Sequence, residues 1–208
     1  NDKYHNISHQ LNLAKTDWSW AGLIFDYNLD GKEDIFVTNG YRKYGSDNDS
    51  RIKINQTKIE YNNRVPLEMK KRLYDELPSE KLSNLLYKNE GNLTFNEVGE
   101  ESNILEPSFS NGAAYADLDN DGDLEIVVNN IDDNAFIYKN LSVENNLGNY
   151  LKVELKGNLS ENFAKGTIYF GKSSKIKESK RVRGYLSSVS DELHFGLGKV
   201  SKIDSLVV

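Results

Sequence analysis

Short apolar runs recur along this chain, and polar stretches rich in Asn and Gly separate them. The first two runs, 21–25 and 35–38, flank one acidic segment, and the runs 113–116 and 126–128 flank another. Their β-branched and aromatic residues, bounded by Asn and Gly, predict strands. Because only a short polar loop separates the members of each pair, the pattern predicts two β-hairpins.

The surroundings of the two hairpins repeat. Each second strand ends in Asn, and an aromatic strand follows further on, at 85–89 in the first unit and at 135–140 in the second. Residues 93–98 are predicted to add an outer strand to the first unit, after a turn at 90–92. Self-similarity of this kind indicates a repeat of small antiparallel sheets, each with its own hairpin.

An insertion at roughly 41–83 lengthens the first unit. Its early part, 45–50, is polar and is predicted to be a loop. The segment 66–77 predicts a helix, since Pro66 suits the first helical turn and Pro78 ends it. Its apolar residues could pack on one side: Leu67, Met69, Leu73 and Leu77. Such an insertion is either a surface for a partner or a decorative loop, and the sequence favours neither.

From Asn149 onward the pattern changes. Short candidate strands follow one another and indicate a separate, small β unit: 150–155, 167–170, 180–183, 192–198 and 203–208. Within it, the glycines of 194–198 separate apolar residues that are expected to be buried. We interpret 194–198 as a structural signature that joins this unit to the preceding sheets, with these apolar residues buried nearby: Tyr185, Leu186, Leu193, Phe195 and Leu197.

The composition is that of a globular chain. Among the 208 residues, 38% are hydrophobic and 28% are charged, and the net charge is −6. The negative charge argues against a nucleic-acid-binding surface, and no run approaches the roughly 18 apolar residues of a membrane span. The absence of Cys removes thiol nucleophiles and Cys-based zinc sites. Asn1 is not an initiator Met, so a signal peptide or lipoprotein anchor is expected upstream of this chain.

The two acidic segments carry the strongest chemical signal. Both read D-x-[DN]-x-D-G-x-x-[DE], at 26–34 (loop one) and at 117–125 (loop two). Ca²⁺ takes about six to eight oxygen ligands, which alternate residues of one tight loop can supply. Gly31 and Gly122 stand where the chain must turn sharply. The predicted ligands in loop one are the side chains of Asp26, Asn28, Asp30 and Asp34 and the carbonyl of Lys32; in loop two they are the side chains of Asp117, Asp119, Asp121 and Glu125 and the carbonyl of Asp123.

These loops are not EF-hands. An EF-hand loop has 12 residues between two helices and closes with a Glu at its last position. The residues at that position are Val37 and Val128, which cannot act as ligands, and strands are predicted on both sides. Plain acidic turns without metal are the alternative, since Asp, Asn and Gly favour turns. Two matches in one chain make this alternative the weaker one.

Several of these segments resemble known families. Residues 16–20 with loop one, and 110–117 with loop two, resemble FG-GAP/VCBS repeats. Residues 183–188 and 194–198 resemble the ASPIC/UnbV domain. Together the motifs resemble cartilage acidic protein-like and Bacteroidetes-type surface proteins. The resemblance implies an all-β fold: a partial β-propeller of two blades at 1–148, with the helical insertion at about 41–83, followed by a small β domain at 149–208.

The resemblance also implies a function. It suggests Ca²⁺ in the hairpin loops, a secreted, periplasmic or outer-membrane-surface location, and no catalytic activity. A closed propeller needs about four to eight blades, so the chain is expected to be the C-terminal part of a longer protein whose remaining blades are partners. Two departures stand out: 163–167 is shorter than the family's Gly-rich version, and the Trp-Pro-x-Gly turn expected after the last strand is absent.

Few other residues suggest chemistry. His5 and His9 fit a polar terminal tail, and His194 fits a strand-packing role better than that of a catalytic base. Trp18, Trp20, Tyr41 and Tyr44 could form a platform for a sugar ring, although core packing is favoured. No Gly-x-Ser-x-Gly elbow, phosphate loop or dinucleotide motif occurs.

The sequence therefore predicts a non-enzymatic extracellular binding or adhesion module with structural calcium. Its ligand would be an unidentified protein or glycan. The alternatives are a glycan-binding or accessory part of a carbohydrate-processing system, or a non-catalytic fragment of a larger hydrolase.

Overall fold

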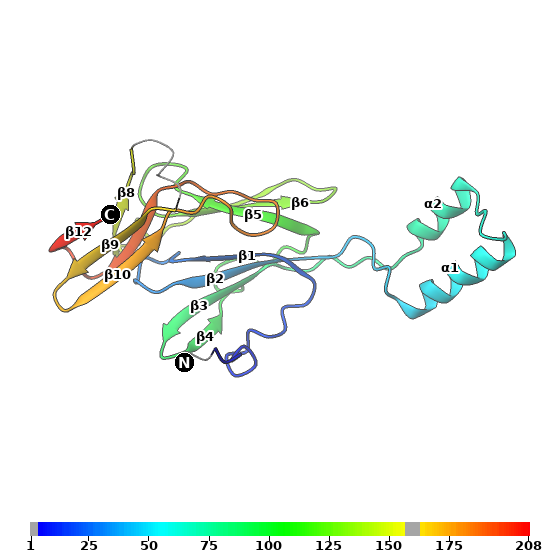
Figure 1. Ribbon diagram of the computed structural model, residues 1–208, viewed down its shortest axis with the longest axis horizontal. Coiled ribbons are helices and arrows are strands. Elements are labelled where there is room, and N and C mark those ends of the chain that lie inside the picture. Colours follow the sequence, from blue (N-terminus) through cyan, green and yellow to red (C-terminus); the bar gives the residue numbers. More distant parts are fainter. Residues whose placement is uncertain (1–3, 157–162) are drawn as a thin grey trace.

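The computed structural model describes residues 4–156 and 163–208. The chain is mostly β and forms several small antiparallel sheets, from which two helices project (Figure 1). The first sheet has the order β1-β2-β3-β4, made of Ser19–Phe25, Asp34–Asn39, Leu85–Gly91 and Thr94–Glu97. All four strands lie where the short apolar and aromatic runs predict them. The turn between β3 and β4 lies at 92–93, so it begins later than the predicted 90–92.

The second sheet repeats the first with one strand fewer. It has the order β5-β6-β7, made of Ser110–Ala116, Glu125–Asn130 and Phe136–Tyr138. In both sheets the first two strands form a hairpin, and the acidic loop connects them. The predicted hairpins are thus confirmed. These two sheets by themselves do not form a closed ring.

A single hydrophobic core holds the two sheets together. Along β1 the side chains alternate, so that Leu23 and Phe25 are buried while Ile24 is 58% exposed. Phe25 stacks on Tyr115 of β5 with ring centroids 4.7 Å apart. Val128 of β6 is fully buried in the same core. Burial of both sheets against each other fixes the two hairpins in one rigid body.

The residues after Asn149 form two further sheets with a core of their own. One has the order β10-β9-β12 and the other the order β11-β8. Phe195 and Ile168 are fully buried between them. The strands are β8 (Asn149–Val153), β9 (Lys165–Phe170), β10 (Ser173–Glu178), β11 (Leu193–Gly198) and β12 (Ser205–Val207).

Two expectations for this C-terminal unit are wrong. Residues 180–183 are not a strand, and only an isolated bridge joins Val182 to Ser188. Tyr185 and Leu186 are not buried, since they are 37% and 88% exposed. Leu186 has a φ of +47°, which ends any extended segment there. The strand β10 was missed instead, because its Ser- and Lys-rich sequence lacks an apolar face.

The insertion forms two helices, α1 (Asn48–Glu60) and α2 (Leu67–Asp75). The helix predicted at 66–77 is confirmed as α2, whereas the loop predicted at 45–50 is partly wrong because α1 begins within it. The Asp47 side chain caps α1 by accepting a hydrogen bond from Ser50 N at 2.8 Å. Neither helix buries a residue, and both lie apart from the sheets (Figure 1). Leu67, 66% exposed, does not pack as expected.

In the part of the chain that the structure describes, no helix is long and apolar enough to cross a membrane.

Candidate metal centres

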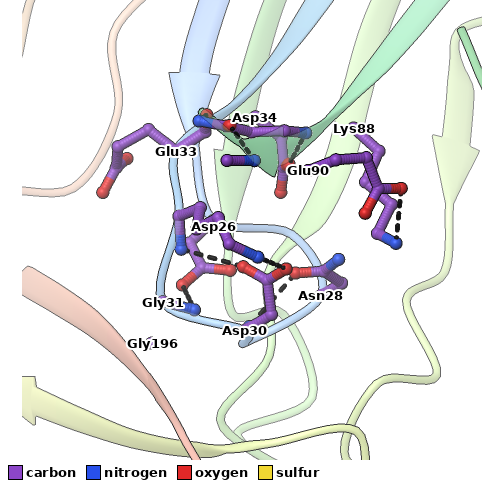
Figure 2. A network of polar contacts seen from close by, with 12 residues as sticks. Asp26, Asn28, Asp30, Gly31, Glu33, Asp34, Lys88, Glu90 and Gly196 are labelled. Carbon is purple, nitrogen blue, oxygen red and sulfur yellow. Dashed lines mark hydrogen bonds and ion pairs between the residues drawn. The ribbon is translucent and has the colours of Figure 1, made fainter. Parts of the chain in front are cut away.

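Loop one is shaped by its own side chains. Gly31, with a φ of +89°, donates its N–H to Asp26 Oδ2 at 2.7 Å. Asp30 N donates to Asn28 Oδ1 at 3.1 Å. These bonds turn the three polar side chains toward the inside of the loop, as Figure 2 shows. Oxygen atoms from alternate residues therefore face the inside of the loop.

The last acidic residue of loop one braces the surrounding strands. Asp34 is fully buried. Its Oδ2 accepts a hydrogen bond from Tyr27 N at 3.2 Å, and its Oδ1 accepts one from Asn89 N at 2.8 Å (Figure 2). A single carboxylate thus ties the start of the loop to the third strand of the sheet.

Asp26 carries the clearest sign of a missing partner. Its residue is 2% exposed, and its Oδ1 is buried without a hydrogen-bond donor among the described residues. Burial raises the pKa of Asp26 to about 6 and that of Asp34 to about 7. An ionised carboxylate in such surroundings is costly unless a cation or donors compensate it. A metal ion bound at Oδ1 would remove this cost.

Loop two repeats two features of this arrangement. Asp117, at the position of Asp26, also has a buried Oδ1 without a donor among the described residues. Glu125, at the position of Asp34, accepts hydrogen bonds from Leu118 N at 2.8 Å and from Asn140 N at 3.3 Å. Two hairpins distant in sequence share one unsatisfied oxygen and one bracing carboxylate, which argues against chance.

The other predicted ligands of loop two are divided between two groups. Carboxylate oxygens of Asp117, Asp119 and Glu125 lie within 4.8 Å of one another. Asp121 instead lies with Asp123 and Glu144, whose oxygens also lie within 4.8 Å of one another. Burial, together with its acidic neighbours, raises the pKa of Asp123 to about 6. Both groups of carboxylates offer only oxygen atoms as ligands, which fits a hard cation such as Ca²⁺.

Lysines lie close to several of these carboxylates. Lys32 Nζ is 2.8 Å from Asp30 Oδ2 in loop one. In loop two, Lys139 Nζ is 3.0 Å from Asp119 Oδ2, and Lys152 Nζ is 3.3 Å from Asp117 Oδ2. The sequence reasoning assigned Lys32 only through its carbonyl, and it missed Glu144 and the other lysines. Neither Glu144 nor Lys152 lies in the repeated motif, so only the fold brings them to the loop.

The C-terminal unit contacts loop one through its backbone. Gly198 N donates to Leu29 O at 2.8 Å. Lys175 Nζ donates to both Gly31 O and Gly196 O at 2.6 Å. A Cβ atom on Gly196 would lie 1.8 Å from Asp26 Oδ2, so only glycine fits against this carboxylate (Figure 2). The motif 194–198 therefore packs directly on the candidate metal site.

The same unit contacts loop two through side chains. His194 Nε2 lies 2.8 Å from Gly122 O, so the ring donates this hydrogen bond in its Nε2-protonated form. Tyr150 stacks on His194 and donates its hydroxyl to Asp121 O at 3.1 Å. Burial lowers the pKa of His194, which favours the neutral ring. The prediction that 194–198 joins the C-terminal unit to the hairpin sheets is confirmed, and His194 has a structural role there.

The four aromatic residues proposed as a platform do not all meet. Trp18, Tyr41 and Tyr44 form a cluster with ring centroids 4.2–5.9 Å apart, next to the base of the helices. Trp18 and Tyr44 are 38% and 39% exposed. Trp20 instead packs on Tyr185 and donates its Nε1–H to Gly40 O. Three aromatic rings therefore remain as a candidate surface.

Comparison with known proteins assigns one part of the chain. Residues 164–208 match the family described as ASPIC and UnbV. The match covers β9 to β12, with the motif 194–198 that packs on both loops, and it leaves the hairpin sheets unassigned. No curated protein matches the chain.

Proposed function

We propose that this chain is a calcium-stabilised, non-enzymatic binding module of an extracellular or cell-surface protein. In this proposal the two hairpin sheets are FG-GAP/VCBS-like blades of a β-propeller, which the remaining blades of a longer chain complete. The match of 164–208 to the ASPIC and UnbV family supports an extracellular type of module. The observation that carries the calcium site is the pair of buried, unpartnered oxygens, Asp26 Oδ1 and Asp117 Oδ1.

The residues of both loops fit a calcium ion. In loop one Asp26, Asn28 and Asp30 would hold it, together with the Lys32 carbonyl and Asp34. In loop two the corresponding residues are Asp117, Asp119, Asp121 and Glu125, with the Asp123 carbonyl. The ion would supply positive charge to a crowded group of carboxylates, whose mutual repulsion otherwise opens the hairpin.

A structural role for the ion follows from where the ligands are held. Asp34 and Glu125 are buried, and each accepts hydrogen bonds from a backbone N–H at the start of its loop and from one in or just after the third strand of its sheet. The C-terminal unit covers Asp26 through Gly196. Ligands enclosed in this way support the hairpin, and this favours a scaffold over an enzyme.

Calcium binding and melting temperature test the proposal together. Isothermal titration of the metal-free chain should give dissociation constants of about 10⁻⁴–10⁻³ M, as in other extracellular modules. A hundredfold excess of Ca²⁺ over that constant should stabilise the fold by about 2.7 kcal/mol, which EGTA should remove.

Matched variants show whether the stabilisation by Ca²⁺ comes from the two loops. Asp26→Asn with Asp117→Asn should abolish most of the Ca²⁺-dependent stabilisation. Asp49→Asn, on the exposed helix α1, changes the same kind of side chain and should leave it intact. An identical melting curve in Ca²⁺ and in EGTA would mean that the loops are metal-free turns.

The partner surface admits a second candidate. The exposed cluster of Trp18, Tyr41 and Tyr44 favours a glycan ligand, because aromatic faces pack well against the apolar faces of sugar rings. A glycan array probed with the parent chain and with Trp18→Ala tests it. Binding that Trp18→Ala abolishes supports the glycan, and no binding leaves the projecting helices α1 and α2 as the surface for a protein partner.

A further inference from the structure

Loop one contains its own cation at a place where loop two has none. The fifth and seventh residues of loop one are Asp30 and Lys32, and Lys32 Nζ lies 2.8 Å from Asp30 Oδ2. The corresponding residues of loop two are Asp121 and Asp123, which are both carboxylates. The positive charge that Lys32 supplies in loop one is thus replaced by a second negative charge in loop two.

A third carboxylate joins this pair from outside the motif. Glu144 follows β7, and one of its oxygens lies within 4.8 Å of oxygens of Asp121 and Asp123. Asp123 is fully buried. Its Oδ2 accepts a hydrogen bond from Val143 N at 2.9 Å, while its Oδ1 has no donor among the described residues. A buried carboxylate oxygen without a partner is costly, and a bound cation would satisfy it.

The negative charge around loop two is large enough to attract more than one cation. Its carboxylates are Asp117, Asp119, Asp121, Asp123, Glu125 and Glu144, and two lysines, Lys139 and Lys152, contact them among the described residues. Lys139 Nζ lies 3.0 Å from Asp119 Oδ2 and 3.2 Å from Glu144 Oε1, so it stands between the two carboxylate groups. Lys152 also pairs with Glu192 at 3.4 Å, so the two lysines leave most of the negative charge of the six carboxylates without compensation.

We propose that loop two holds two divalent cations, and that carboxylates of Asp121, Asp123 and Glu144 bind the second one. The first ion is that of the proposed function, on which this inference rests. The second ion shares Asp121 with the ligand set of the nine-residue motif and adds two ligands from outside that set, the Asp123 side chain at the seventh position and Glu144. Oxygen donors alone select a hard ion such as Ca²⁺. Glu144 is exposed, so water completes the coordination of this ion.

Equilibrium dialysis against radioactive Ca²⁺ counts the ions at saturation. The parent chain is compared with Glu144→Gln and with Glu60→Gln, which removes the same charge from the exposed helix α1. Loss of the exposed Glu144–Lys139 ion pair costs little stability by itself, so Glu144→Gln should fold. Circular dichroism at saturating Ca²⁺ checks this, and Asp123→Asn serves as a second, nearly isosteric variant.

The expected result is one Ca²⁺ fewer per chain in Glu144→Gln and in Asp123→Asn, with the parent count retained in Glu60→Gln. An equal count in the parent and in folded Glu144→Gln overturns the second site, while the proposed function stands as long as the parent binds Ca²⁺. A parent that binds no Ca²⁺ overturns both.

Discussion

Loop one and loop two share a nine-residue pattern but differ in how their charge is balanced. Around loop one the carboxylates are Asp26, Asp30, Glu33 and Asp34, and three lysines approach them: Lys32, Lys175 and Lys177. Lys175 and Lys177 come from β10 of the C-terminal unit. Around loop two, six carboxylates face Lys139 and Lys152. Loop one is thus nearly neutral, whereas loop two retains a large negative charge.

This difference shows that a repeated ligand pattern does not fix the role of the ion. In loop one, lysines from the loop and from β10 already supply positive charge, so the fold there depends on packing against the C-terminal unit. In loop two, the remaining negative charge makes the fold depend on bound cations. We therefore expect changes in packing to affect loop one more, and changes in ligands to affect loop two more.

The largest effect is expected where the C-terminal unit covers loop one. Gly196→Ala would place a Cβ 1.8 Å from Asp26 Oδ2, and Asp26 is buried and cannot move aside. Overpacking of this kind should cost about 3 kcal/mol of unfolding free energy. Urea denaturation in saturating Ca²⁺ measures this loss.

Gly122→Ala is the matched change in loop two. The three atoms nearest its Cβ would all belong to the ring end of Tyr150, a side chain that is partly exposed and can turn away. The φ of +105° at Gly122 should still cost about 1–2 kcal/mol. A Gly122→Ala variant less stable than Gly196→Ala would contradict the comparison.

Calcium affinity should depend more on the ligands of loop two than on those of loop one. Asp121→Ala removes a carboxylate that no lysine neutralises in the described part of the chain, and it should weaken binding about tenfold, or by about 1.4 kcal/mol. Asp30→Ala should have a smaller effect, because Lys32 already occupies one oxygen of Asp30. Isothermal titration of both variants measures the two losses of Ca²⁺ affinity. Equal losses would contradict the proposed difference between the loops.

Two lysines should have opposite roles. Lys175→Met leaves the carbonyls of Gly31 and Gly196 without their common donor and should cost about 1 kcal/mol of stability.

Lys152→Met removes a cation that competes for Asp117, so Ca²⁺ affinity should rise at low salt. Melting and titration curves for each variant separate these effects. Weaker Ca²⁺ binding in Lys152→Met would show that this lysine supports the site.

The last effect concerns pH in the absence of metal. Asp26 and Asp34 of loop one have pKa values raised by burial to about 6 and about 7, above those of an unfolded chain. The folded state therefore binds more protons between about pH 4 and 7, and stability in EGTA should rise as the pH falls from 7.5 to 5.5. The melting temperature should increase by about 2–4 °C for each kcal/mol gained. Saturating Ca²⁺ should remove the rise, since bound carboxylates stay ionised. A metal-free chain that melts at lower temperature at pH 5.5 would refute this.

Much of the fold could be predicted from local sequence pattern. The strands of both hairpin sheets are visible because short apolar runs bounded by Asn and Gly mark them, as at 21–25 and 126–128. Helix α1 was not visible, because its apolar residues form no stripe and none of them is buried. The segment 180–183 has Val182 as its one apolar residue, and it forms only the single bridge at that position instead of the predicted strand. Helix α2 also buries no residue, and it could be predicted because Pro66 and Pro78 mark its two ends.

The positions of the candidate sites could be predicted from the sequence. The balance of charges around them could not. The motif locates the ligands because the loop is local in sequence. Lys152 and Lys175 lie in β8 and β10, and their approach to the loops depends on strand pairing that the sequence does not display. The repeated Asn89 and Asn140 are visible in the sequence. Only the structure shows that their N–H groups bond to Asp34 and Glu125.

The contact of Gly196 with Asp26 has a consequence for the order of folding. The hairpin around loop one is local and can form early. The strand β11, whose Gly196 covers Asp26, is separated from this hairpin by most of the chain. Contacts so distant in sequence form slowly, because a long loop must close first. We therefore expect Ca²⁺ to enter a complete loop one only after the folding transition state. In stopped-flow experiments, Ca²⁺ should then slow unfolding and leave the refolding rate unchanged. Faster refolding in Ca²⁺ would instead mean that the ion nucleates the hairpin.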